Sequence, residues 1–397
     1  MHEKETAMPF MMKFWLIFGI AFFISLVVTP ITVWLAPRIG VMDIPKDDRR
    51  MHTKPIPRFG GLAIFAGTAV AVTVILTALG DDSDVFDKIN QDLLLRTLIV
   101  GIFVYILGLL DDIFHLRPMI KLLGQAAAAI ALYIAGVRVH IIMFFGASAD
   151  STAAYVVGFI VTMVWVIAIM NTVNLIDGVD GLAAGITIIA SFCISYIAYI
   201  HGYYLACLLM LAVAGACIGF LPFNFYPAKT FMGDGGSLFL GFCLASFSLL
   251  QPVKSITLGA LVIPLLVLGI PVIDTAFAIF RRLVNKKPVM QADKGHIHHR
   301  LMRAGLGQRR TVLILYGITA VMGIGAVVFS RHLYVEAAGL MILGFAFVYI
   351  VLTDANHWIP KVKEDKEETA DGSSPETAEK DSNKEAASAA EGDAQDK

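Results

Sequence analysis

The chain has 397 residues, of which 57% are hydrophobic and only 16% are charged. This apolar content exceeds what the core of one soluble domain can bury, so we predict an all-α, polytopic integral membrane protein. The formal net charge of −1 hides an uneven distribution, because the last 37 residues, from Lys361, hold 12 acidic and 6 basic residues. We therefore expect membrane lipids, and no nucleic acid, among its partners.

Hydrophobic runs of membrane-crossing length follow one another along the chain. A helix needs roughly 20 apolar residues to cross a hydrocarbon core of about 30 Å. We expect about eleven transmembrane helices, and those runs that contain Gly or Pro are compatible with membrane helices. Their approximate bounds are 10–36, 60–80, 93–110, 120–136, 154–171, 182–200, 204–222, 236–251, 255–280, 311–330 and 335–353.

The basic residues of the connections predict the orientation, because cytoplasmic loops collect Lys and Arg. The 37–59 loop holds six of them and the 281–310 loop holds nine, far more than the connections on the opposite side. With eleven spans, the N-terminus lies outside the cell membrane and the C-terminus inside. We expect residues 1–360 to form a membrane domain with cytoplasmic loops. Residues 361–397, which lack aromatic residues, should form a disordered acidic cytoplasmic tail.

Five polar segments fall on the predicted cytoplasmic face. Carboxylates, amides, histidines, basic residues and glycines are concentrated in them, whereas the opposite face has mostly short connectors. Such a distribution indicates a site built from cytoplasmic loops and helix ends. The segments are HTKPIPRFGG at 52–61, LLDDIFHLRPMIK at 109–121, NTVNLIDGVDGLA at 171–183, FNFYPAKTFMGDGGS at 223–237 and ADKGHIHHRLMRAG at 292–305.

Each segment also has an ordinary explanation. The pair Asp111 and Asp112 is compatible with a solvated helix end. Asn174, Asp177 and Asp180 recur at a spacing of three, which would place them on one face of a helix, but the glycines of DGVDG also suit a turn. The GDGGS stretch lacks the Lys-Ser/Thr ending of a nucleotide phosphate loop.

The basic and histidine residues are similarly ambiguous when each is taken alone. His296, His298 and His299 could bind zinc, but no HExxH arrangement is present, so a loop that contacts anions is favoured. Membrane-edge cations are most often anchors for lipid phosphates, and the residues concerned are Lys54, Lys121, Arg281 and Arg282.

One chemistry uses all of these groups together. Carboxylate and amide oxygens suit Mg²⁺, which usually retains waters and substrate phosphates among its ligands. Cations and histidines suit a diphosphate, and glycines allow backbone amides to approach phosphate oxygens. A site at the membrane edge suggests that one substrate is a lipid.

The five segments, in this order, closely resemble those of the polyprenyl-phosphate N-acetylhexosamine-1-phosphate transferases. The resemblance covers nearly all of residues 10–353, and the HIHHR stretch at 296–300 resembles the WecA/TagO group, which uses UDP-N-acetylglucosamine. It implies transfer of N-acetylglucosamine 1-phosphate to undecaprenyl phosphate, with release of UMP, as the first membrane step of teichoic acid linkage-unit or other cell-envelope polysaccharide synthesis. A homodimer, a Mg²⁺ cofactor and its replacement by Mn²⁺ are further expectations.

The resemblance also implies roles for individual residues. Asp111, Asp112 and Asp177 would be catalytic, with the first two at the acceptor phosphate. Asp234 and Asn174 would hold Mg²⁺ against the donor diphosphate. The implied substrate-binding residues are Lys54, Lys121, which would bind the lipid phosphate, Asp180, Asn224, Arg282, His296, His298 and His299.

Three alternatives stay open at this point. The donor could be another UDP-activated sugar, as in the MraY group. Asp111 or Asp112 could act as a nucleophile through a covalent intermediate, although a phosphate monoester is already largely ionised at neutral pH, which favours direct attack. Finally, Asp274 within an apolar run would suit the ion-coupling carboxylate of a secondary transporter, but we find no internal repeat.

Overall fold

A computed structural model gives the structure of the protein, and it describes residues 8–44, 54–80, 82–86, 91–139, 152–250, 257–286 and 296–357. The chain divides into a compact unit, Met1–Asn356, and a second unit, His357–Lys397. Almost all of the second unit, including the predicted disordered tail, lies outside the described residues. The prediction for the tail therefore stays a prediction.

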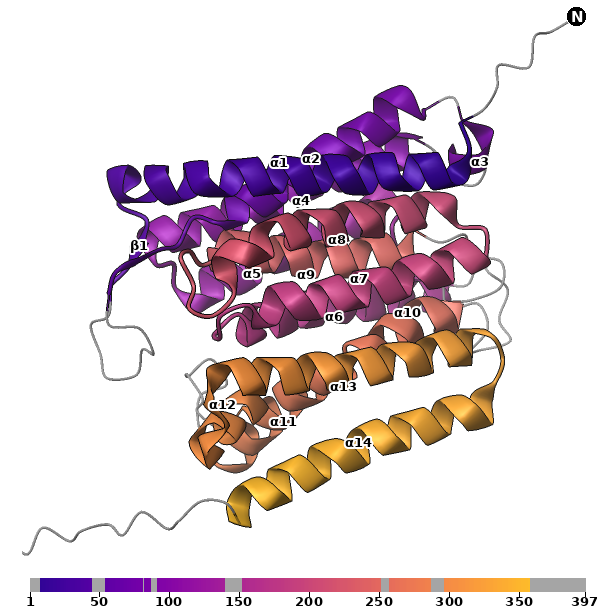
Figure 1. Cartoon of the computed structure of the whole chain (residues 1–397). Coiled ribbons are helices and arrows are strands. Elements are labelled where there is room, and N and C mark those ends of the chain that lie inside the picture. Colours follow the sequence, from indigo (N-terminus) through magenta and orange to yellow (C-terminus); the bar gives the residue numbers. More distant parts are fainter. Residues whose placement is uncertain are drawn as a thin grey trace, which may run out of the picture. The chain divides into compact units, whose positions relative to one another are not determined.

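The first unit is a bundle of helices whose long members lie side by side (Figure 1). A short antiparallel pair of strands, β1 and β2, lies at one end of the bundle. The elements are α1 Phe10–Ile39, β1 Met42–Asp43, β2 Ile56–Pro57, α2 Gly61–Ala78, α3 Ser83–Phe86, α4 Gln91–Phe114, α5 Pro118–Ala135, α6 Thr152–Ile176, α7 Leu182–Ile200, α8 Tyr204–Asn224, α9 Gly233–Leu249, α10 Thr257–Val267, α11 Gly269–Val284, α12 Ile297–Leu301, a π-helical turn Met302–Leu306, α13 Gly307–Ser330 and α14 Tyr334–His357.

The prediction of an all-α membrane protein is confirmed. Among the described residues, eight helices are long and apolar enough to cross a membrane, or nine if one bent pair counts as a single span. Each of the predicted runs coincides with a helix or, at 255–280, with the pair α10 and α11, which is bent by 86°. Two further apolar helices, Gly233–Leu249 and Tyr334–Phe347, are shorter than a typical span.

Helix α9 lies at the centre of the bundle, and all 17 of its residues are buried. It packs against α4 and α6, while α8 packs against α1, α2 and α7. Small residues allow this close packing, as is common between membrane helices. At Gly108 of α4, a Cβ atom would lie only 2.4 Å from the carbonyl oxygen of Asp234, so a larger residue would separate α4 from the first turn of α9. Asp234 thus lies in the first turn of the buried helix α9, which fixes its position in the site.

Candidate active site

The acidic pair lies in the last turn of α4, and both carboxylates are buried. After α4 the chain turns through His115, whose φ is 51°, and α5 begins at Pro118. The Oδ1 atom of Asp111 accepts a hydrogen bond of 2.8 Å from the backbone N–H of Leu116 in this turn. Asp111 therefore both belongs to the site and fixes the turn between α4 and α5.

Asp112 reaches from α4 to the N-terminus of α9. Its two oxygens accept hydrogen bonds from the backbone N–H groups of Asp234, at 2.8 Å, and Gly235, at 2.9 Å. The positive end of the α9 dipole and these otherwise unpaired N–H groups stabilise a negative charge at this position. Gly233 is required beside it, because its φ is +70° and a Cβ atom would lie 2.5 Å from Oδ2 of Asp112.

This geometry differs from the expectation that the glycine-rich turn accommodates phosphate. The amides of Asp234 and Gly235 donate to a protein carboxylate instead, and the space beside Gly233 is filled by Asp112 and the backbone of Arg58. The sequence indicated that the turn would bind an anionic group. It could not indicate that this group would come from α4.

Asp234 lies where three donors converge. Its Oδ1 atom accepts hydrogen bonds of 2.9 Å from Nδ2 of Asn174 and from Nη2 of Arg58. Its Oδ2 atom accepts one of 2.8 Å from Nζ of Lys121. Nδ2 of Asn174 also donates to Oγ of Ser237, one turn further along α9.

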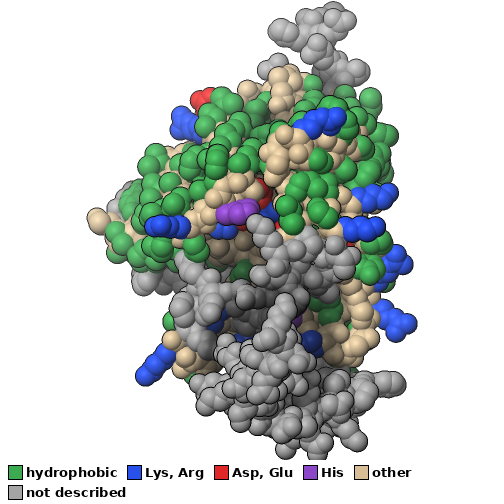
Figure 2. Space-filling view, turned by 90° about the vertical axis from the view of Figure 1, so that its left-hand side faces the viewer, with side chains coloured by type: hydrophobic (Ala, Val, Ile, Leu, Met, Phe, Trp, Pro, Cys, Tyr) green, Lys and Arg blue, Asp and Glu red, His purple; other side chains and the backbone are tan. Residues whose placement is uncertain are grey.

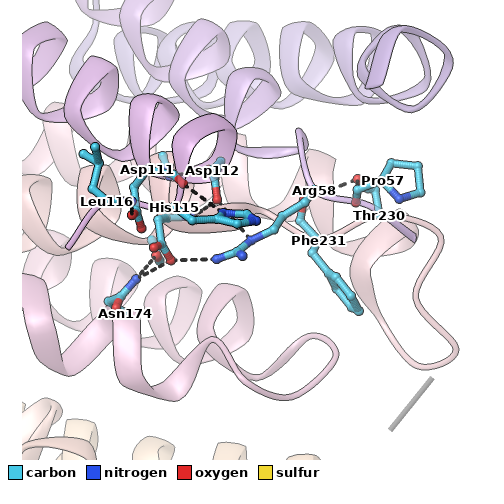
Figure 3. Close-up of polar contacts among 12 residues, drawn as sticks. Pro57, Arg58, Asp111, Asp112, His115, Leu116, Asn174, Thr230 and Phe231 are labelled. Carbon is cyan, nitrogen blue, oxygen red and sulfur yellow. Dashed lines mark hydrogen bonds and ion pairs between the residues drawn. The ribbon is translucent and has the colours of Figure 1, made fainter. Parts of the chain in front are cut away.

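Two cations bridge the three carboxylates, as Figure 3 shows in part. Lys121 joins Asp111, at 2.6 Å, to Asp234 through its single nitrogen. Arg58 joins Asp112 to Asp234 with two different nitrogens, because Nε lies 3.0 Å from Asp112 and Nη2 lies 2.9 Å from Asp234. These five side chains form the acidic cluster, in which positive and negative groups alternate.

Arg58 is a site residue that the sequence-based assignment missed. The backbone around it is fixed, because the N–H of Arg58 donates to the carbonyl oxygen of Val41. The N–H of Phe231 donates to the carbonyl oxygen of the preceding residue, Pro57 (Figure 3). Burial disfavours its charge, but the carboxylates of Asp112 and Asp234 outweigh this effect and raise the pKa of Arg58. Lys54, the cation of the same loop that the resemblance implies for substrate binding, is exposed. The only sequence signal for Arg58 is its position in the PIPRFGG stretch. This stretch does not show which cation of the loop contacts Asp234.

Asn174, Asp177 and Asp180 do not share a helical face, because α6 ends at Ile176. Asn174 faces Asp234, whereas Oδ2 of Asp180 accepts a hydrogen bond of 2.9 Å from the N–H of Ala228. Burial raises the pKa of the Asp177 carboxyl well above its usual range, although the charge of Arg58 lowers it. Asp177 therefore lies within the electrostatic field of the acidic cluster.

Asn224 ties two predicted site loops together. Its Oδ1 atom accepts a hydrogen bond of 3.1 Å from the N–H of Gly181, and its Nδ2 donates one of 3.0 Å to the carbonyl oxygen of Thr230. The side chain is buried. Both ends of the amide are thus bonded to backbone, which fits a residue that fixes the loops around the site.

The histidines at the start of α12 form a second cluster with Asp274 of α11. Nδ1 of His296 lies 2.9 Å from Oδ2 of Asp274, whose Oδ1 accepts a hydrogen bond of 3.1 Å from the N–H of Ile297. The ring of His298 is buried and stacks on that of His296, with centroids 5.6 Å apart, and the ring centroid of His299 lies 4.3 Å from that of His298. Arg282 is partly buried in the last turn of α11.

The oxygen groups of the acidic cluster are of the type that Mg²⁺ prefers, but their arrangement is not that of a metal site. Both oxygens of Asp234 already accept hydrogen bonds from Arg58, Lys121 or Asn174. In the described part of the chain, no group of three or more His, Cys, Asp or Glu side chains is placed to hold a metal ion. A divalent cation would fit only if a protein cation moved.

The end of the bundle that carries β1 combines charged and apolar surface. Figure 2 views this end and shows a histidine with acidic and basic side chains beside it, between hydrophobic surfaces, while further Lys and Arg side chains lie around the rim. Such a surface can hold an anionic headgroup at the edge of a membrane while its lipid chain stays in the apolar region.

Comparison with known proteins identifies relatives over most of the chain. Residues 94–251 match the model of the family described as glycosyl transferase family 4. A Bacillus subtilis protein named as a probable undecaprenyl-phosphate N-acetylglucosaminyl 1-phosphate transferase is 41% identical over 317 residues, 78% of this chain and 84% of the relative. The decaprenyl-phosphate N-acetylglucosaminephosphotransferase of Mycolicibacterium smegmatis is 32% identical, over 80% of this chain and 82% of its own length. A phospho-N-acetylmuramoyl-pentapeptide-transferase of Desulforudis audaxviator is 31% identical, over 77% and 95%.

Proposed function

Because the chain belongs to glycosyl transferase family 4, we propose that it transfers N-acetylglucosamine 1-phosphate from UDP-N-acetylglucosamine to undecaprenyl phosphate. The products are undecaprenyl-diphosphate-N-acetylglucosamine and UMP. The names of the relatives support a polyprenyl phosphate acceptor and an activated N-acetylglucosamine donor. We propose the cytoplasmic face as the location of the site and cell-envelope polysaccharide synthesis as the use of the product, and a homodimer stays a prediction.

The observation that carries this proposal is the alternation of carboxylates and cations in the acidic cluster. Lys121 lies in the first turn of α5, an apolar helix of membrane length, and this position supports a role for its ammonium in binding a phosphate whose chain lies in the bilayer. Asp111 holds that ammonium at 2.6 Å. A membrane-edge cation fixed by buried carboxylates suits an anionic lipid better than a neutral acceptor.

The proposed reaction is an attack by an oxygen of the lipid phosphate on the sugar-bearing phosphorus of the donor. The new P–O bond forms the lipid diphosphate, and the bond to UMP breaks. Stabilisation of the charge on the transferring phosphoryl group is the main task of such a site. In this geometry Asp111 and Asp112 each accept hydrogen bonds at both oxygens, which favours a role in positioning cations over a role as nucleophile.

We propose Mg²⁺, with Mn²⁺ as a substitute, as the cofactor. Asp234 and Asn174 are the residues that would hold it, and when bound it would neutralise charge on the donor diphosphate. The carboxylate and amide oxygens of Asp234 and Asn174 support this proposal. Because Arg58 and Lys121 contact Asp234, one of these two cations would have to move away when the metal binds.

Two competing functions are less well supported. A muramoyl-peptide donor is suggested by the Desulforudis relative, but the relatives named for N-acetylglucosamine include the one that is 41% identical. A transporter would use Asp274 as an ion-coupling carboxylate, yet this side chain is bonded to His296 and to the backbone of α12.

The test is incubation of the purified protein with undecaprenyl phosphate, Mg²⁺ and a panel of UDP-sugars, followed by extraction of lipid products. The proposal predicts a lipid-soluble product from UDP-N-acetylglucosamine alone or far above the other donors. A product from UDP-N-acetylmuramoyl-pentapeptide instead would support the competing donor. Absence of any lipid product would contradict a transferase.

A further inference from the structure

Arg58 occupies the carboxylates that the proposed cofactor needs. Its Nη2 atom lies 2.9 Å from Oδ1 of Asp234, and its Nε atom lies 3.0 Å from Oδ1 of Asp112. Asp112 also accepts the N–H groups of Asp234 and Gly235 in the first turn of α9, so this carboxylate has little freedom to turn. A divalent ion that approached Asp234 with Arg58 in place would meet a guanidinium charge on the same oxygen.

The two cations of the acidic cluster, Lys121 and Arg58, differ in how each could move away from Asp234. Lys121 contacts Asp111 and Asp234 with one nitrogen, so its movement would break both contacts. Arg58 uses a separate nitrogen for each carboxylate, so Nη2 can leave Asp234 while Nε stays on Asp112. The Arg58 side chain is also 29% exposed, whereas its backbone is held by one hydrogen bond to Val41 and by the neighbouring Pro57–Phe231 hydrogen bond. Only the end of the side chain needs to move.

We propose that Arg58 takes the place of the divalent cation on Asp234 and competes with it for this carboxylate. The inference rests on the proposed function, because it presupposes a metal-assisted reaction. In the structure Arg58 neutralises Asp112 and Asp234, two carboxylates that would otherwise repel each other within a buried cluster. With metal, its remaining positive charge lowers the affinity of the site for the ion.

Binding of Mn²⁺ to the purified full-length protein, followed by the electron paramagnetic resonance signal of the free ion, tests this competition without lipid or nucleotide sugar. We expect Arg58→Gln to bind Mn²⁺ about tenfold more tightly than the wild type, since one positive charge a few ångströms from the ion is removed. Arg58→Lys retains the charge and should bind within about threefold of the wild type. Asp234→Asn should lose the binding and so identifies the site.

Arg38→Gln is the matched control. Arg38 lies in the last turn of α1, its guanidinium stacks 3.5 Å from the ring centroid of Trp34, and the side chain donates to the carbonyl oxygen of Trp34. The substitution removes the same charge from the chain outside the acidic cluster, so Mn²⁺ affinity should stay at the wild-type value. An equal gain in both Gln variants would overturn the proposal, because it would reflect net charge alone.

A second measurement covers the case in which Arg58→Gln folds poorly. The rise in Tm on addition of Mg²⁺ should be larger for Arg58→Gln than for the wild type, because the ion then replaces a missing counter-charge. An unchanged Mn²⁺ affinity and an unchanged Mg²⁺ shift would overturn the competition, as would tightening by Arg58→Lys equal to that by Arg58→Gln. A wild-type protein that makes no lipid product would contradict the proposed function instead.

Discussion

Asp234 is the residue on which the acidic cluster depends. It is buried, and its carboxylate accepts three hydrogen bonds from α5, α6 and the loop after β2, through Lys121, Asn174 and Arg58. A buried carboxylate is stable only where such partners offset the loss of its hydration. The same negative charge would attract a divalent cation, and it also holds the cations Arg58 and Lys121.

We predict that Asp234→Asn lowers turnover by at least about a hundredfold, because the neutral amide weakens the electrostatic stabilisation of phosphoryl transfer. The amide is of the same size and still offers one oxygen to Asn174 or Arg58, so the protein should fold. Product formation at saturating substrates and Mg²⁺ measures the turnover. Thermal unfolding shows whether the variant is folded. Turnover near that of the wild type would exclude Asp234 from the reacting site.

The second prediction concerns Asp177 and the pH dependence of folding stability. Burial raises the pKa of its carboxyl, and Asp234, Asp112 and Asp180 raise it further, while Arg58 lowers it. Because the folded state holds this proton more tightly than the unfolded state, ionisation costs stability as pH rises above about 4, the pKa of an unperturbed Asp. Asp177→Asn removes that cost.

The Asp177→Asn variant should therefore have a higher Tm than the wild type at pH 8, and this advantage should shrink as the pH falls toward 4. Unfolding scans in detergent with EDTA measure the difference in the absence of metal. A constant difference across this pH range would contradict the account of Asp177.

Among the elements, α12 shows how a short helix is placed against the bundle. Asp274 of α11 accepts the N–H of Ile297, in the first turn of α12, and contacts Nδ1 of the adjacent His296. A carboxylate on Nδ1 holds the ring in one orientation and leaves Nε2 for another partner. We therefore propose that Asp274 positions His296, which is one of the predicted substrate-binding residues.

We predict that Asp274→Ala lowers kcat/KM by about tenfold to a hundredfold, since an N–H group and a ring nitrogen lose their acceptor. Asp274→Asn keeps an oxygen for Ile297 but presents N–H groups to His296, so it should change the pH profile of kcat/KM more than it changes Tm. Steady-state kinetics over pH, compared with unfolding scans, separates the two effects. An unaltered pH profile with a lowered Tm would reduce Asp274 to a structural role.

The helices could be predicted from sequence far better than the site. Long apolar runs have few other stable structures in a membrane, so the positions of the long helices follow the hydropathy, whereas the short helices α3 and α12 were not predicted. The contacts of Arg58 could not be predicted in this way. They depend on a pair of two-residue strands and on backbone hydrogen bonds between loops far apart in the sequence, such as the bond from the N–H of Phe231 to the carbonyl oxygen of Pro57.

At the scale of the whole molecule, polar segments separated along the chain meet at one end of a membrane bundle. The loop after β2, the end of α4, the ends of α6 and α8 and the start of α9 are joined there by side-chain and backbone hydrogen bonds. The rest of the bundle presents many apolar side chains at its surface. This distribution fits an enzyme that joins a water-soluble donor to a lipid phosphate at the membrane edge.

Identification of the nucleotide product tests this account most directly. The site gathers cations and carboxylates suited to two phosphate-bearing substrates, so attack at phosphorus should release UMP, and added UMP should drive the nearly isoenergetic reaction backward, because one phosphoanhydride replaces another. Chromatography of the water-soluble products from purified protein, undecaprenyl phosphate, Mg²⁺ and UDP-N-acetylglucosamine distinguishes UMP from UDP. We predict UMP in stoichiometric amount with a lipid that retains a diphosphate link. Stoichiometric UDP with a singly phosphorylated lipid sugar would contradict the account.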